Sequence, residues 1–96
     1  MKINTKKVLN SLKGEPLKNE DKLPLTVGET LSNIMTNYKA GGKMKTYILA
    51  KKFMDNDEVD LDEADFSLVK TACEQDESYL SSIVSGQILV YLNELK

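Results

Sequence analysis

Apolar residues recur with the 3.6-residue period of an α-helix through most of residues 26–95, and this pattern restricts the chain to a mainly helical fold. Residues 26–38 carry one such apolar face, made of Val27, Leu31, Ile34, Met35 and Tyr38. The sequence Thr26-Val27-Gly28-Glu29 before it is a capping box, in which we expect Glu29 to reach back to the Thr26 amide. We expect this helix to end at Ala40-Gly41-Gly42.

Three further segments show helical periodicity. Residues 43–54 are apolar over more than a narrow stripe, so we expect this helix to be central. Residues 63–75 direct Phe66, Val69, Ala72 and Cys73 inward. Residues 78–95, with Ser78 or Asp76 as the expected N-cap, carry the strongest apolar stripe: Leu80, Ile83, Val84, Gln87, Ile88, Tyr91, Leu92 and Leu95. A glycine inside a helix costs about 1 kcal/mol relative to alanine, so Gly86 predicts a close helix–helix contact.

The first 25 residues show no clear helical period. Gly14, Pro16 and Pro24 punctuate them, and Lys18–Lys22 reads as a second polar turn. We expect a hairpin-like or irregular arm, with a short helix over Lys6–Lys13 as the alternative. The 96 residues therefore predict one domain, with an arm over 1–25 and a compact four-helix bundle over 26–96.

The acidic stretch DNDEVDLDEAD, residues 55–65, raises the question of a calcium site. It fails the EF-hand spacing in two registers, because Val59 or Ala64 falls at loop position 5, which has to supply an oxygen ligand. A helix start fits better: Asp62 as N-cap places Asp65 three residues later, and Leu61 meets Phe66 as a hydrophobic staple. Three acids before it are then interpreted as a solvated linker: Asp55, Asp57 and Glu58.

The composition argues against several classes of function. The chain has no His, no Arg and no Trp. Without His it lacks the commonest zinc ligand and the commonest general base at neutral pH. Without Arg it lacks the side chain that best binds phosphate through two hydrogen bonds. One cysteine, Cys73, gives no disulfide framework, and no apolar run approaches the length of a membrane span. The first residues lack a signal-peptide pattern. We therefore expect no catalytic residues, no metal, no cofactor, no membrane contact and a cytoplasmic location.

Charge is divided unevenly along the chain. Residues 1–52 hold eleven lysines and four acids, a net charge of +7, whereas residues 53–96 hold two lysines and eleven acids, a net charge of −9. Such halves can pair within the chain, pair between subunits or face two different partners. The candidate interaction residues are Lys43, Lys45, Lys51 and Lys52 on one face and Asp55, Asp57, Glu58 and Asp60 on the other.

Three stretches resemble small uncharacterised proteins of tailed bacteriophages and prophages. The first is Leu12-x-Gly14-x-Pro16-Leu17 with Pro24-Leu25-Thr26-Val27-Gly28, and the second is Gly42-Lys43-Met44-Lys45-x-Tyr47-x-Leu49-Ala50. The third joins Val59-Asp60-Leu61-x-x-x-Asp65 to Val84-x-Gly86-Gln87. The resemblance implies an accessory, regulatory or assembly role in the host cytoplasm and carries over no catalytic residue.

Together these observations predict a non-enzymatic protein-interaction module. Its partner is a host or phage protein or a second copy, which allows a homo-oligomer built head to tail from the charged halves. The alternative is a DNA-binding transcriptional regulator that uses the Lys-rich second helix after the Gly41-Gly42 turn. The acidic run and the absence of Arg argue against nucleic acid.

Overall fold

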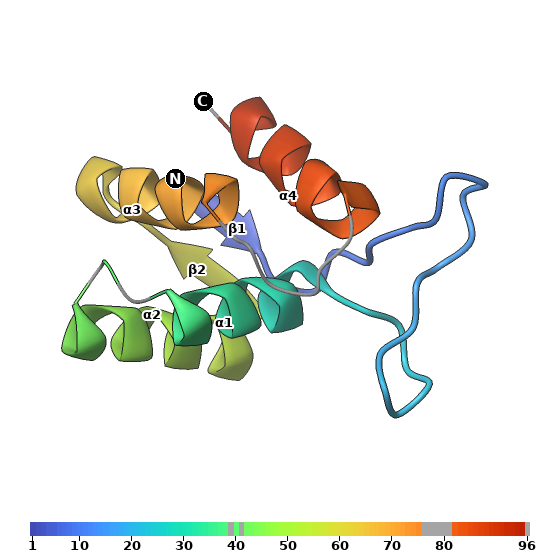
Figure 1. The fold of residues 1–96 in the computed structure, drawn as a ribbon, viewed down its shortest axis with the longest axis horizontal. Helices are drawn as coiled ribbons and strands as arrows, with labels where there is room; N and C mark the ends of the chain where they lie inside the picture. Colours follow the sequence, from blue (N-terminus) through green and yellow to red (C-terminus); the bar gives the residue numbers. More distant parts are fainter. Residues whose placement is uncertain (39, 41, 76–81, 96) are drawn as a thin grey trace.

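The computed structural model describes residues 1–38, 40, 42–75 and 82–95. In these residues the chain forms six elements (Figure 1). In chain order they are β1 (Lys2–Asn4), α1 (Val27–Asn37), α2 (Lys43–Asp55), β2 (Glu58–Asp60), α3 (Glu63–Glu74) and α4 (Ser82–Glu94). The four-helix, mainly α prediction is confirmed, and a short antiparallel sheet joins it. The expected start of the fourth helix, at Asp76 or Ser78, lies outside the described residues.

The central helix is α1, which packs against α2 and against α3 (Figure 1). Its predicted apolar face is buried apart from the half-buried Tyr38, and small residues along both edges of that face are buried too: Thr30 on one edge, Gly28 and Ser32 on the other. Small side chains let neighbouring elements approach a helix closely, so α1 can be enclosed on two sides. The sequence prediction gave this central place to α2, and that prediction was wrong. On α2 only Thr46, Leu49, Ala50 and Phe53 are buried.

The N-terminal strand pairs with the acidic run instead of folding into a local hairpin. β1 and β2 are antiparallel, with Ile3 opposite Val59. Both of these side chains are buried, and their neighbours along each strand are exposed. The linker interpretation was therefore wrong for Glu58, which lies in a strand, and for Asp55, which is the last residue of α2. The alternation of apolar and acidic residues in Glu58-Val59-Asp60-Leu61 is the period-2 pattern that signals it.

Residues 8–26 form the arm, which extends away from the helices (Figure 1). Its three extended segments are joined in a ring of backbone hydrogen bonds that involves three leucines eight residues apart. Leu9 N–H donates to Leu25 O, Leu25 N–H donates to Leu17 O, and Leu17 N–H donates to Leu9 O. Leu9 is buried in the core, and the other two pack against it. The arm is therefore irregular but ordered, and no helix forms over Lys6–Lys13.

The ends of α1 and α3 follow the predicted capping chemistry. Thr26 is the N-cap of α1 and its hydroxyl accepts from Glu29 N–H at 3.2 Å; Asp62 likewise accepts from Asp65 N–H at 2.7 Å. The Glu29 carboxylate departs from the capping box, because it accepts from Asn19 Nδ2 of the arm. α1 ends at Asn37, before the predicted stop, and Gly41 lies outside the described residues.

The core is one apolar cluster that all the helices and both strands contribute to. α3 supplies the predicted Phe66, Val69, Ala72 and Cys73, and Leu61 is buried beside them in the same cluster. α4 supplies Val84, Ile88 and Leu92, all among its predicted inward residues. No helix among the described residues is long and apolar enough to cross a membrane.

Two glycines in helices give a matched test of this packing. A Cβ added at Gly28 would lie 2.7 Å from Phe53 O and 2.7 Å from the Thr5 Cβ, whereas one added at Gly86 meets nothing within 4 Å. Gly28→Ala should therefore lower the free energy of unfolding by about 1–3 kcal/mol through overpacking. Gly86→Ala should raise it by up to about 1 kcal/mol through helix propensity. Urea unfolding of both variants measures this, and equal effects would contradict the packing described.

Candidate functional site

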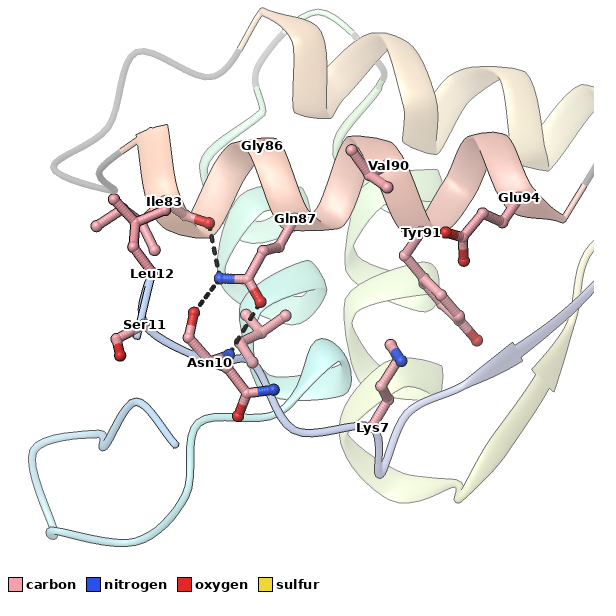
Figure 2. A pocket seen from close by; sticks show the side chains of 11 residues that line it. Lys7, Asn10, Ser11, Leu12, Ile83, Gly86, Gln87, Val90, Tyr91 and Glu94 are labelled. Atoms are coloured by element: carbon pink, nitrogen blue, oxygen red, sulfur yellow. Dashed lines mark hydrogen bonds between the residues drawn. The ribbon is translucent and has the colours of Figure 1, made fainter. Parts of the chain in front are cut away.

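A groove of about 570 Å³ runs between α4 and residues 7–12 at the start of the arm (Figure 2). Its walls are mainly apolar, with Leu9, Leu12, Ile83 and Val90 among the lining residues. Gly86 lies in this groove with open space above it, so the prediction that it marks a close helix–helix contact within the chain was wrong. Because Gly86 has no Cβ, the groove is wider at this position than it would be with alanine.

Polar side chains of α4 fasten the arm across this groove. Gln87 accepts from Asn10 N–H at 2.9 Å, and its amide donates to the carbonyls of Asn10 and Ile83 (Figure 2). One turn later, Tyr91 Oη accepts from Asn4 N–H at 2.8 Å, and the Lys7 ammonium lies over the Tyr91 ring. These contacts give the groove a structural role, since they join the two ends of the sequence.

The second candidate is the outward face of α2, which we define as Met44, Tyr47 and Ile48 with the adjoining Lys51, Lys52 and Asp55. The three apolar side chains are 78%, 65% and 43% exposed. At 100° per residue they lie opposite the buried positions of the same helix. α2 is therefore apolar on two opposite faces, and only one of them is covered by the described chain.

A shallow hollow of about 260 Å³ lies at the C-terminal half of this face. Tyr47 and Ile48 line it together with Lys51 and Lys52, and it ends at Asp55 and Asn56. The lining of the hollow is therefore mainly apolar, although two lysines contribute to it. A volume of this size holds one large apolar side chain, so the arrangement suits an anchor residue of a partner rather than a small-molecule reaction.

The structure places all four candidate acids beside basic groups of the same chain. Asp57 lies 3.1 Å from Lys6 Nζ, Glu58 lies 3.6 Å from Lys2 Nζ, and Asp60 lies 3.1 Å from the Met1 amine. Asp55 pairs with Lys51 at 3.1 Å, one turn apart on α2. These distances show that the acidic residues pair with basic groups within the chain, which is one of the three arrangements that the uneven charge allows.

The candidate lysines fall into two groups. Lys45 and Lys51 are held by carboxylates: hydrogen bonding to Asp65 raises the pKa of Lys45, and hydrogen bonding to Asp55 raises the pKa of Lys51. Lys43 and Lys52 have no ion-pair partner among the described residues. The outward face of α2 therefore keeps unneutralised positive charge next to its apolar residues.

Metal-binding side chains do not cluster in the part of the chain that the structure describes. No group of three or more Asp, Glu or Cys in that part of the chain could hold a metal ion. Cys73 is buried on the apolar face of α3, as its position in the sequence predicted. No protein-family model, no curated protein and no solved structure matches the chain.

Sequence reasoning named the lysines of this site but missed its apolar centre. Residues 43–54 were expected to form a central helix, and the structure leaves Met44, Tyr47 and Ile48 on its exposed side. The available signal was the low amphipathicity of residues 43–54, which marks a helix that must be covered on both sides. It does not say whether the second cover comes from the same chain.

The role assigned to Gln87 predicts a measurable loss. Gln87→Met keeps the length of the side chain and removes its hydrogen bonds to Asn10, so we expect the free energy of unfolding to fall by about 1–2 kcal/mol. Hydrogen exchange at the Asn10 amide should accelerate more than that of the α1 core. Asn93→Met, on an exposed position of the same helix, is the control and should change neither quantity. Unchanged exchange at Asn10 would contradict the role.

Proposed function

We propose that this protein is a non-enzymatic protein-interaction module that docks a partner on the outward face of α2. The observation that carries the proposal is the exposure of Met44, Tyr47 and Ile48 at positions i, i+3 and i+4 of one helix. A helix that is apolar on both sides is typical of a helix buried on both sides. The described chain covers one side, and a partner covers the other.

The biological setting of the proposal is a phage or prophage protein with an accessory, regulatory or assembly role in the host cytoplasm. The support for it is the resemblance of three sequence stretches, one of which spans Gly42–Ala50 and so includes the start of the docking face. In this role, apolar contact supplies affinity and the charged residues supply orientation and association rate.

The DNA-binding alternative uses the same helix and makes a different demand on it. A recognition helix presents hydrogen-bond donors and acceptors to base edges at the centre of its exposed face. In α2 this face carries Met44, Tyr47 and Ile48, with Lys51 one turn further on, and Lys51 is held by Asp55. We therefore favour a protein partner. Binding to duplex DNA that weakens steeply as salt rises would support the alternative.

Truncating the apolar centre tests the proposal. The Tyr47→Ala/Ile48→Ala double variant should weaken binding of a protein partner by about 2 kcal/mol or more, because exposed aromatic and aliphatic anchors dominate such interfaces. Its free energy of unfolding should change by less than about 1 kcal/mol, because both side chains are exposed. Pull-down from host lysate, followed by titration of the retained protein, measures the first quantity.

The matched control is Leu12→Ala/Leu23→Ala, which removes two exposed leucines from the arm. It should leave binding at the wild-type level. A partner that the α2 variant retains and the arm variant loses would contradict the assignment of the face. Reversing Lys51 and Lys52 to Glu should also weaken binding, and an unchanged set of associations after that reversal would count against the proposal.

A further inference from the structure

We infer that the partner of the outward face of α2 is an acidic amphipathic helix of another protein. This inference rests on the proposed function and adds the chemistry of the partner. It follows from the combination on one helix of an exposed apolar strip, a hollow of side-chain size and two lysines, Lys43 and Lys52, that have no ion-pair partner among the described residues.

The apolar strip has the dimensions of a helix contact. Met44, Tyr47 and Ile48 lie along the axis of α2, and the hollow continues this line to Asn56 at the end of the helix. At 1.5 Å per residue the stretch from Met44 to Asn56 is about 18 Å long, which three turns of a partner helix would cover. Apolar side chains at i, i+3 or i+4, and i+7 of such a helix meet this strip.

The charges around the strip fix the sign of the partner. Lys43 and Lys52 lie on either side of the apolar residues, while Lys51 lies in line with them and is held by Asp55 at the end of α2. On the neighbouring elements, Asp65 is engaged by Lys45, and Asp57 by Lys6. Acids that flank the apolar stripe of the partner would lie beside Lys43 and Lys52, which have no ion-pair partner among the described residues.

The same charges disfavour a second copy of this chain as the occupant. α2 carries four lysines and one aspartate between Lys43 and Asp55. Two copies docked through this face would bring these lysines together, and like charges across an interface oppose association. The acidic residues 57–60 of a second copy are no better suited, because their three carboxylates, on Asp57, Glu58 and Asp60, already pair with the N-terminal region.

Synthetic helical peptides test the partner chemistry directly. The first peptide carries leucines at helical spacing with glutamates beside them, the second replaces each glutamate by lysine, and the third keeps the glutamates and replaces the leucines by serine. We expect the full-length protein to bind the first peptide at least about tenfold more tightly than either of the others. Raising the salt concentration should reduce this preference without abolishing binding of the first peptide.

Variants locate the effect on the protein. Lys43→Met/Lys52→Met keeps the apolar stems and should reduce the affinity for the acidic peptide several-fold, with a weaker salt dependence. The matched control is Lys13→Met/Lys18→Met in the arm, which removes the same charge elsewhere and should have no effect. Tyr47→Ala/Ile48→Ala should weaken binding of every peptide that binds.

The outcomes separate the two proposals. If the acidic and basic peptides bind equally and Tyr47→Ala/Ile48→Ala weakens both, the partner chemistry is wrong and the docking face stands. If no peptide binds, the acidic-helix inference is overturned. If, in addition, the α2 variant changes no association in the lysate experiment, the proposed function fails too. If the leucine-free acidic peptide and duplex DNA bind as tightly as the first peptide, the face is a polyanion site.

Discussion

The contact between Thr5 and Gly28 joins the end of strand β1 to the start of α1, and Thr5 also bonds to the residues that follow α2. Thr5 donates its N–H to Asp57 O and its hydroxyl to Asn56 O, and its carbonyl accepts from Gly28 N–H at 3.0 Å. These bonds attach the N-terminal strand to the end of α2 and also satisfy an amide in the first turn of α1, which has no acceptor within its own helix. Only glycine leaves space for this approach, since any Cβ would meet Phe53 O and the Thr5 side chain.

The strand pairing that continues from Thr5 decides what the charges of the protein can do. Because β1 is antiparallel to β2, the lysines near the N-terminus come to lie beside the acids of residues 57–60. Exposed ion pairs of this kind contribute little to stability, yet they neutralise the acidic run where it lies. On α2, Lys52 and the neighbouring Lys43 have no ion-pair partner among the described residues, and they lie beside the exposed apolar side chains of the proposed docking face.

Much of the helical framework was predictable because its signals are local. Thr26 and Asp62 cap their helices as their positions imply, and the apolar stripes of α1, α3 and α4 point inward. Two features were not predictable, because they depend on residues far apart in the chain. β2 needs a partner strand more than fifty residues away, and the central place of α1 depends on Gly28, Thr30 and Ser32, whose small size carries no periodic apolar signal.

The leucine ring of the arm and the docking face are two further features that the sequence alone did not predict. Leu9, Leu17 and Leu25 are spaced eight residues apart, and Pro16 and Pro24 precede the last two. This spacing alone does not predict the ring, because the hydrogen bonds form between three separate segments of the arm. The apolar residues on both faces of α2 led to the expectation of a central helix, whereas Met44, Tyr47 and Ile48 are exposed. What the sequence left open was whether this chain or another molecule covers them.

The central claim is that the basic and acidic halves close on each other within one chain and leave a positive, apolar face on α2 for a different protein. Absolute mass by size-exclusion chromatography with light scattering, at low and at high salt, tests it most directly. The account predicts the mass of one chain in both conditions, because the acids are already paired internally and the α2 faces repel one another. An oligomer at low salt that dissociates at high salt would contradict it, since the charged halves would then pair between chains.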